Sequence, residues 1–177
     1  MNSIITDRLV LRSFRKEDSE AVFRNWSSDE RVARYCRWYP HKSVKDTEEF
    51  IKMSMSNEYS WAITIKGIDE PVGSIDVVGL NSEGVPEIGY VLMHSHWGEG
   101  IMTEALKAVI SELFRKGYEK AAAYYMIDNP ASGRVMEKCG MTHVRNMMVK
   151  RKFGSDEECE VSYCEISCKE NTVVKSD

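Results

Sequence analysis

The chain has 177 residues, 42% hydrophobic and 29% charged, a balance that predicts one globular domain over residues 1–177 rather than a disordered or fibrous protein. A formal net charge of -4 argues against a nucleic-acid partner, and no apolar run approaches the roughly 18 residues that span a membrane. Five cysteines, an odd number without C-x-x-C spacing, predict reduced thiols in a cytoplasmic protein and no metal site.

The N-terminal third of the chain predicts a strand followed by helices. Leu9 and Leu11 alternate with charged or outward-facing neighbours, a period of two that indicates a half-buried strand. A short helical stretch is expected next. Ser43 and Asp46 then have capping-box spacing, which predicts the start of a helix that ends near Asn57.

The middle of the chain predicts a meander and then a long helix. Three alternating runs, 59–65, 72–78 and 88–92, have short connections and are typical of antiparallel strands. From Gly100 the period becomes helical, and Gly117 is the expected stop. The apolar stripe of this helix consists of Met102, Ala105, Leu106, Val109, Ile110 and Leu113.

The C-terminal third continues with a buried strand over 121–127, and Asn129 and Pro130 provide the N-cap and first-turn proline of a helix. Two further strands are expected near 141–149 and 160–166. The strand–helix–strand crossover in the middle of the chain predicts that its two strands are parallel neighbours. The predicted fold is therefore α/β, with a mixed, mostly antiparallel sheet of about seven strands and flanking helices.

A glycine-containing loop joins the strand at 88–92 to the long helix. From Glu87 the sequence is E-I-G-Y-V-L-M-H-S-H-W-G-E-G-I-M-T-E-A. A helix N-terminus offers unpaired N–H groups and a partial positive charge, which suit a phosphate. Gly98 and Gly100 allow the backbone to approach a ligand closely. The alternative is a plain strand-to-helix turn, and the lack of G-K-[ST] excludes a nucleotide-hydrolysing P-loop.

Three motifs, in order, resemble the GNAT acetyltransferase superfamily and its branch of ribosomal-protein and spermidine N-acetyltransferases. They are T-x-R-L-x-L-R at 6–12, I-G-Y-x-L followed by W-G-x-G-x-x-T-E-A within 88–105, and N-x-x-S-x-x-x-x-x-x-G at 129–140. The resemblance covers nearly the whole chain and implies the GNAT fold, a splayed parallel strand pair and acetyl-CoA as cosubstrate. Trp97 and Met102 depart from the general loop pattern Q/R-x-x-G-x-G/A in a way that is normal for the branch.

The resemblance also implies a set of acetyl-CoA contacts. Backbone amides of the loop and helix start would bind the pyrophosphate, and N–H groups of the splayed strand would bond the pantetheine arm and polarise the thioester carbonyl. The implied residues are Val91, Leu92, Met93, Trp97, Gly98, Glu99, Gly100, Ile101, Met102, Thr103, Asn129 and Ser132. Asn129 is equally expected to cap its helix, and Ser132 to be a first-turn polar residue.

The implied reaction is direct attack of a neutral amine on the thioester, which a base assists. Glu87 is the candidate base, because many members carry an acidic residue at this position; the alternative is a strand carboxylate paired with a lysine. Many members protonate the leaving thiolate with a tyrosine where this chain has Met136. Ser132, Tyr124, Tyr125 or solvent would then supply that proton.

No motif identifies the amine acceptor. Tyr35, Trp38 and Tyr39 are candidate acceptor-binding residues, together with a hairpin near 150–156, although half-buried aromatics would give the same pattern. The resemblance, whose branch includes N-terminal acetylating enzymes, slightly favours a peptide N-terminus over a lysine, a polyamine or another small amine, and the acidic balance suits a basic partner. A monomer or homodimer without membrane or nucleic-acid partners is expected. The alternative function is a non-catalytic acyl-CoA sensor.

Overall fold

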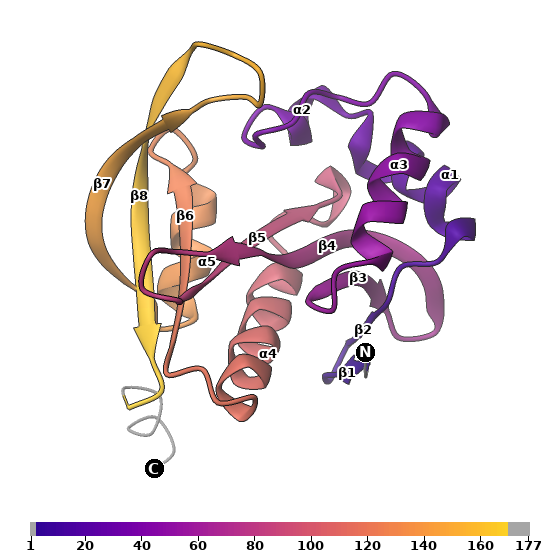
Figure 1. Cartoon of the computed structure of the whole chain (residues 1–177). Helices are drawn as coiled ribbons and strands as arrows, with labels where there is room; N and C mark the ends of the chain where they lie inside the picture. Colours follow the sequence, from indigo (N-terminus) through magenta and orange to yellow (C-terminus); the bar gives the residue numbers. More distant parts are fainter. Residues whose placement is uncertain (1–2, 170–177) are drawn as a thin grey trace.

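The computed structural model describes residues 3–169 and contains one eight-stranded sheet in the order β1-β2-β3-β4-β5-β6-β8-β7 (Figure 1). The strands are β1 (Ile4–Ile5), β2 (Leu9–Arg12), β3 (Ser60–Ile65), β4 (Ile68–Leu80), β5 (Pro86–Leu92), β6 (Lys120–Met126), β7 (Thr142–Lys150) and β8 (Glu158–Ser167). Neighbouring strands in this part of the chain pair antiparallel, except for β5 and β6. The two-residue β1 is the strand that the sequence did not predict.

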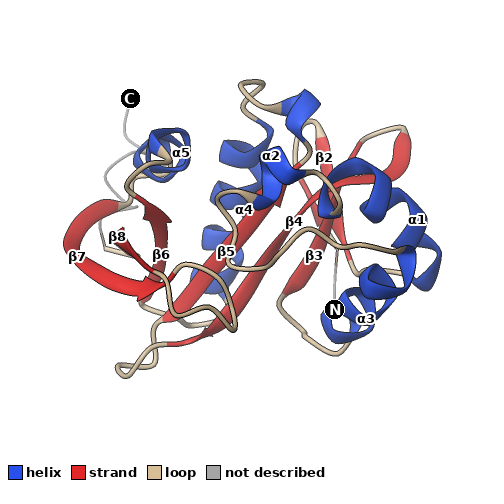
Figure 2. Ribbon diagram, turned by 90° about the horizontal axis from the view of Figure 1, so that it is seen from above, coloured by secondary structure: helices blue, strands red, loops and turns tan. Residues whose placement is uncertain are grey.

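The helical segments are η1 (Lys16–Asp18), α1 (Ser19–Val22), η2 (Phe23–Ser27), α2 (Glu30–Ala33), α3 (Val44–Met55), η3 (His94–His96), α4 (Ile101–Arg115) and α5 (Pro130–Lys138). Seen from above, α1 and α3 lie at one end of the molecule and α5 at the other (Figure 2). The capping box of α3 is confirmed, because Ser43 Oγ accepts the Asp46 amide and the Asp46 carboxylate accepts the Ser43 amide. This helix ends at Met55, slightly before the expected Asn57. Between residues 3 and 169 no helix is long and apolar enough to cross a membrane.

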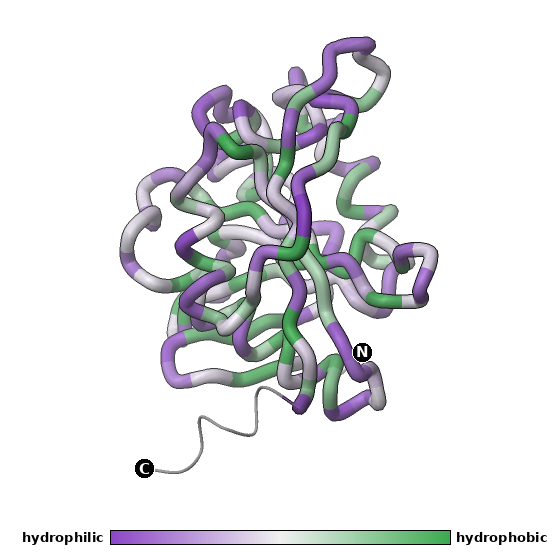
Figure 3. Tube along the Cα trace, turned by 90° about the vertical axis from the view of Figure 1, so that its left-hand side faces the viewer, coloured by the Kyte–Doolittle hydropathy of each residue, from purple (hydrophilic) through white to green (hydrophobic). Residues whose placement is uncertain are grey.

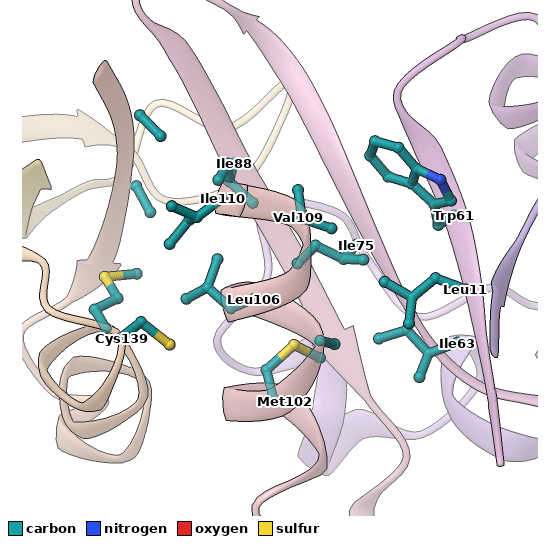
Figure 4. Close-up of a cluster of buried hydrophobic side chains, with 14 of the residues drawn as sticks. Leu11, Trp61, Ile63, Ile75, Ile88, Met102, Leu106, Val109, Ile110 and Cys139 are labelled. Carbon is teal, nitrogen blue, oxygen red and sulfur yellow. The ribbon is translucent and has the colours of Figure 1, made fainter. Parts of the chain in front are cut away.

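The main core lies between α4 and one face of the sheet. Every residue of the predicted α4 stripe is buried, and Figure 4 shows Met102, Leu106 and Val109 facing side chains of the strands. Burial of one large aliphatic side chain is worth about 1.5–3 kcal/mol, so this packing fixes where the start of α4 lies. In the hydropathy trace, hydrophilic segments predominate on the outlying loops (Figure 3).

Met136 and Cys139 of the α5 segment belong to this same core. Cys139 Sγ lies 3.5 Å from the carbonyl oxygen of Thr103, and burial raises the pKa of its thiol to about 11. A thiol with so high a pKa is a poor nucleophile at neutral pH. Cys139 is therefore a packed core residue.

The parallel strands β5 and β6 separate after a short shared stretch, as the resemblance implies. They pair only at Glu87 with Ala122 and at Ile88 with Ala123 among the described residues. Beyond this point β5 continues against β4, and β6 continues against β8. After Ile88, the N–H and C=O groups of β5 that point toward β6 have no partner strand. A ligand can form hydrogen bonds with these groups.

Candidate active site

A cleft of about 1080 Å³ opens where β5 and β6 separate. Its lining comes from both sides of the sheet. We call one side of the cleft the α4 side; it consists of residues 96–103 and the first turns of α5. The other is the α3 side, which consists of the loop 35–41, α3 and the facing residues of β4 and β5. Of the predicted coenzyme contacts, those that line the cleft are Val91, Leu92, Trp97, Gly98, Gly100, Ile101, Met102, Thr103, Asn129 and Ser132. Met93 and Glu99 belong to the same segment but are not part of the lining.

The α4 side presents backbone amides at the start of a long helix. The Trp97 indole Nε1 donates to the Leu92 carbonyl over 2.8 Å and fixes the turn after β5. Gly98 and Gly100 have φ values of 84° and 77°, in the left-handed region that favours glycine. Gly100 is the N-cap of α4 and brings no side chain to the first N–H groups. These amides are therefore available to an anion such as a pyrophosphate.

The first and second sequence motifs meet at Glu104, in the first turn of α4. Thr6 Oγ1 donates to Glu104 Oε1 over 2.6 Å, and Arg8 Nε donates to Oε2 over 2.6 Å. Arg8 also donates to the Glu99 carbonyl over 3.0 Å. Burial alone would raise the pKa of Glu104, but these hydrogen bonds outweigh it and the pKa is lowered. The two motifs thus jointly hold the loop in place, a contact that the sequence did not reveal.

The second and third motifs meet across the split in the sheet. The Tyr90 hydroxyl lies 2.7 Å from Ser132 Oγ and also donates to the Ser132 carbonyl over 3.2 Å. Burial raises the pKa of Tyr90, although its hydrogen bond to Ser132 opposes the rise. Asn129 Oδ1 accepts the Ser132 amide over 3.4 Å, so Asn129 caps α5 and also lines the cleft. Tyr90 was missed as a site residue, although it belongs to the I-G-Y motif.

Glu87 lies on the α3 side, at the first of the two paired positions of β5 and β6. Burial raises the pKa of its carboxyl, while the nearby Arg145 and Arg37 lower it. Among residues 3–169, Glu87 forms no ion pair with a lysine, and the cations that act on it are these two arginines. Its proposed role as a base stays a prediction.

A second carboxylate on the α3 side, Asp76 of β4, was not predicted. The hydroxyls of Ser60 and Ser74 both donate to it, the latter over 3.2 Å. Burial raises the pKa of Asp76 to about 6, although the two hydrogen bonds oppose the rise. The available signal was the S-x-D pattern at 74–76, because alternation places both polar side chains on one face of an otherwise apolar strand.

The aromatic wall of the α3 side is formed by part of the predicted cluster. Tyr35 and Trp38 line the cleft, whereas Tyr39 is 58% exposed and its ring lies beside Lys152. Lys152 Nζ donates to the carbonyl oxygens of Ala33, Cys36 and Trp38, the last two over 2.7 and 3.1 Å. Figure 1 shows the β7–β8 hairpin reaching α2 at this point.

Residues 8–142 match the family model described as an acetyltransferase (GNAT) domain. The chain belongs to the GNAT acetyltransferase family. It is 32% identical over 145 residues to the uncharacterized N-acetyltransferase YoaA of Bacillus subtilis (strain 168), which covers 76% of this chain and 80% of YoaA. The crystal structure of a GNAT-family acetyltransferase from Bacillus anthracis has a TM-score of 0.84 at 26% identity, covering 94% of this chain and 98% of that one.

The GNAT fold is shared with a more distant solved structure. RimL, described as a ribosomal L7/L12 alpha-N-protein acetyltransferase in complex with coenzyme A, has a TM-score of 0.77 at 19% identity, covering 94% of this chain and 98% of that one. Membership of the GNAT family makes this chain an acetyltransferase that uses acetyl-CoA. The open amides of the α4 side and the size of the cleft fit that cosubstrate.

Proposed function

We propose that this GNAT acetyltransferase transfers the acetyl group to a primary alkylamine, with a peptide N-terminus as the first candidate. One observation carries the proposal: the cleft has open helix-start amides on the α4 side and carboxylates on the α3 side, where β5 and β6 part. An anionic coenzyme suits the first set of groups and a cationic amine suits the second. The described activity of RimL supports a peptide N-terminus by likeness of fold alone.

In the proposed mechanism the two sides of the cleft have different tasks. Acetyl-CoA supplies the acetyl thioester when it is bound. The amides of Gly98 to Thr103 would hold its pyrophosphate, and the free N–H groups of β5 beyond Ile88 would face the thioester carbonyl. Glu87 would accept a proton from the attacking amine, since burial brings its pKa closer to neutrality.

Ser132 would serve the leaving sulfur, because its hydroxyl lies on the far side of the split. Tyr90 holds this hydroxyl in place and can pass it a proton through their 2.7 Å contact. Met136, at the position where many members carry a tyrosine, is buried in the core and has no proton to donate. Tyr124 and Tyr125 also line the cleft and are the other candidate donors.

The proposal is tested with labelled acetyl-CoA and a fractionated bacterial lysate, followed by a panel of pure amines. We expect label in peptide or protein amino groups, with one equivalent of coenzyme A thiol released for each acetyl group transferred. Label found only in small molecules would refute the peptide acceptor. Coenzyme binding without transfer to any amine would refute catalysis itself.

A further inference from the structure

Asp76 and Glu87 stand on neighbouring strands and face the same side of the cleft. Asp76 pairs in register with Gly89 of β5, and Glu87 precedes Gly89 by one alternation of the strand. Diagonal neighbours of this kind have Cα atoms about 7–8 Å apart. Gly89 places no side chain between the two carboxylates, and the Val78 side chain lies close to it, because a Cβ on Gly89 would lie 2.9 Å from Val78 Cγ1. Val78 also lines the cleft, so the surface beside the two carboxylates is apolar.

The two carboxylates differ in their charged neighbours. Arg37 and Arg145 act on Glu87, whereas Asp76 bonds only to the hydroxyls of Ser60 and Ser74 and has no ion-pair partner among residues 3–169. A buried carboxylate is costly unless a cation accompanies it. The other titratable groups that line the α3 side are Tyr35, Cys36, Arg37, His41, Asp46, Glu49 and Glu87. Apart from Arg37 and His41 they bring no positive charge.

We infer that Asp76 is the anchor for the acceptor's ammonium group. Its carboxylate, which has no ion-pair partner among residues 3–169, pairs with the ammonium and holds the nitrogen on the α3 side of the cleft, near the point where β5 leaves β6. The inference rests on the proposed function and adds the substrate class, an amine that binds as the cation. Glu87 keeps the role of base, so binding and proton transfer belong to different carboxylates.

In the proposed transfer, the ammonium held by Asp76 gives one proton to Glu87, and the freed lone pair forms the C–N bond to the thioester carbonyl carbon. The C–S bond breaks and its electron pair leaves with the sulfur. The second proton of the nitrogen passes to the thiolate, so the products are the amide, the free thiol and one proton on Glu87.

The test compares Asp76→Asn, Glu87→Gln and Glu48→Gln in steady-state kinetics with n-butylamine, 1,4-diaminobutane and a hexapeptide that begins with serine. Asp76→Asn should raise the KM of the amine by about tenfold or more, the loss of one charge-assisted contact, and leave the KM of acetyl-CoA unchanged. Glu87→Gln should lower kcat instead. Glu48→Gln, which changes a solvent-exposed carboxylate of α3 outside the cleft lining, is the control and should stay within about twofold of the parent.

The pH dependence of the amine KM, measured on the unmodified enzyme, tests the inference even if Asp76→Asn does not fold. The KM of the amine should rise as the pH falls below about 6, because Asp76 is then protonated, while the KM of acetyl-CoA stays flat. If acetyl transfer occurs but the KM of the amine is the same in the parent and in Asp76→Asn, and does not change with pH, this inference is wrong and the proposed function still holds. Absence of transfer to any amine of the panel or the lysate overturns both.

Discussion

The two sides of the cleft are built in different ways. On the α4 side, residues 96–103 contribute mainly backbone: helix-start amides, two left-handed glycines and a turn fixed by Trp97, all within one contiguous segment. The α3 side consists of side chains from the loop 35–41, α3, β4 and β5, and Phe153 of the β7–β8 hairpin also lines the cleft. A site made from contiguous backbone leaves a motif in the sequence, whereas a site assembled from distant side chains does not.

This difference follows the chemistry of the two ligands. A pyrophosphate is the same in every acetyl-CoA, so one backbone geometry suffices for it. Acceptor amines differ in size and charge, and the residues that meet them can change while the fold stays the same. Experiments that damage one side and spare the other therefore measure how independent the two sides are.

The largest expected effect is on the α4 side. Gly100→Val should weaken acetyl-CoA binding by about a thousandfold, since a β-branched residue distorts the left-handed turn and at least two charge-assisted amide contacts are lost. Isothermal titration with acetyl-CoA measures the effect. Gly84→Val is the matched control, because Gly84 has a φ of 76° and open space at its Cβ but lies outside the cleft lining. Equal affinity losses in both variants would assign the effect to folding.

Glu87→Gln should have the next largest effect, on turnover. We expect kcat to fall about a hundredfold near neutral pH, with acetyl-CoA affinity unchanged. Because an alkylamine with a pKa of about 10 loses its proton unaided at high pH, activity should recover in part as the pH rises. The pH-rate profile of both enzymes checks this. A profile that the substitution leaves unchanged would return the role of base to water.

The sequence predicted the helix starts and the α4 stripe well because their signals are local. The α4 stripe, the capping box of α3 and the cap at Asn129 each depend on residues within a few turns of one another. Family resemblance added Glu87. Asp76 was missed although the S-x-D pattern at 74–76 is local, because the pattern places the two side chains on one face of a strand but does not show that this face lines a cleft.

The sequence analysis named the hairpin near 150–156 but did not single out Lys152 within it. In the sequence, Lys152 belongs to a short basic run. In the structure its ammonium group donates hydrogen bonds to carbonyl oxygens of the segment 33–38, and Ala33 lies 119 positions away in the sequence. The irregular loop that carries Tyr39 has no period, so alternation could not separate the two aromatics that line the cleft from the one that does not.

A third prediction concerns stability on the α3 side. The folded-state pKa of Asp76, about 6, lies above its unfolded value. Between about pH 4 and 6 the native state therefore binds more protons than the unfolded state, and the free energy of unfolding falls as the pH rises through that window. Asp76→Asn removes this titration. Relative to the parent, the variant should gain about 2 kcal/mol of stability between pH 4 and pH 7.5, an order-of-magnitude figure.

Urea unfolding of both proteins at the two pH values measures this gain, and Glu49→Gln provides the reference for a carboxylate exposed to solvent. An added alkylamine should stabilise the parent at pH 7.5 more than it stabilises Asp76→Asn, because it supplies the missing cation. A difference between parent and variant that does not change with pH would mean that Asp76 is ionised like an ordinary carboxylate.

The smallest expected effect tests whether the hairpin shapes the α3 side. Lys152 holds three carbonyls of the segment that carries Cys36, Arg37 and Trp38, and the Phe153 amide donates to the Arg37 carbonyl over 2.7 Å. Lys152→Ala removes the ammonium but leaves the Phe153 bond, so the loop should loosen without leaving its place. We expect the KM of the amine to rise about threefold, which corresponds to roughly 0.7 kcal/mol, with acetyl-CoA affinity unchanged.

Hydrogen exchange should locate the change for Lys152→Ala, with faster exchange confined to the segment 33–41. Lys150→Ala is the matched control, because this neighbouring lysine pairs only with exposed carboxylates of its own hairpin and should alter neither exchange nor KM. Lys152→Arg restores a positive donor group and should recover part of the loss. If Lys152→Ala instead weakened acetyl-CoA binding as much as amine binding, the two sides of the cleft would be one mechanical unit, and the independence inferred from their construction would be wrong.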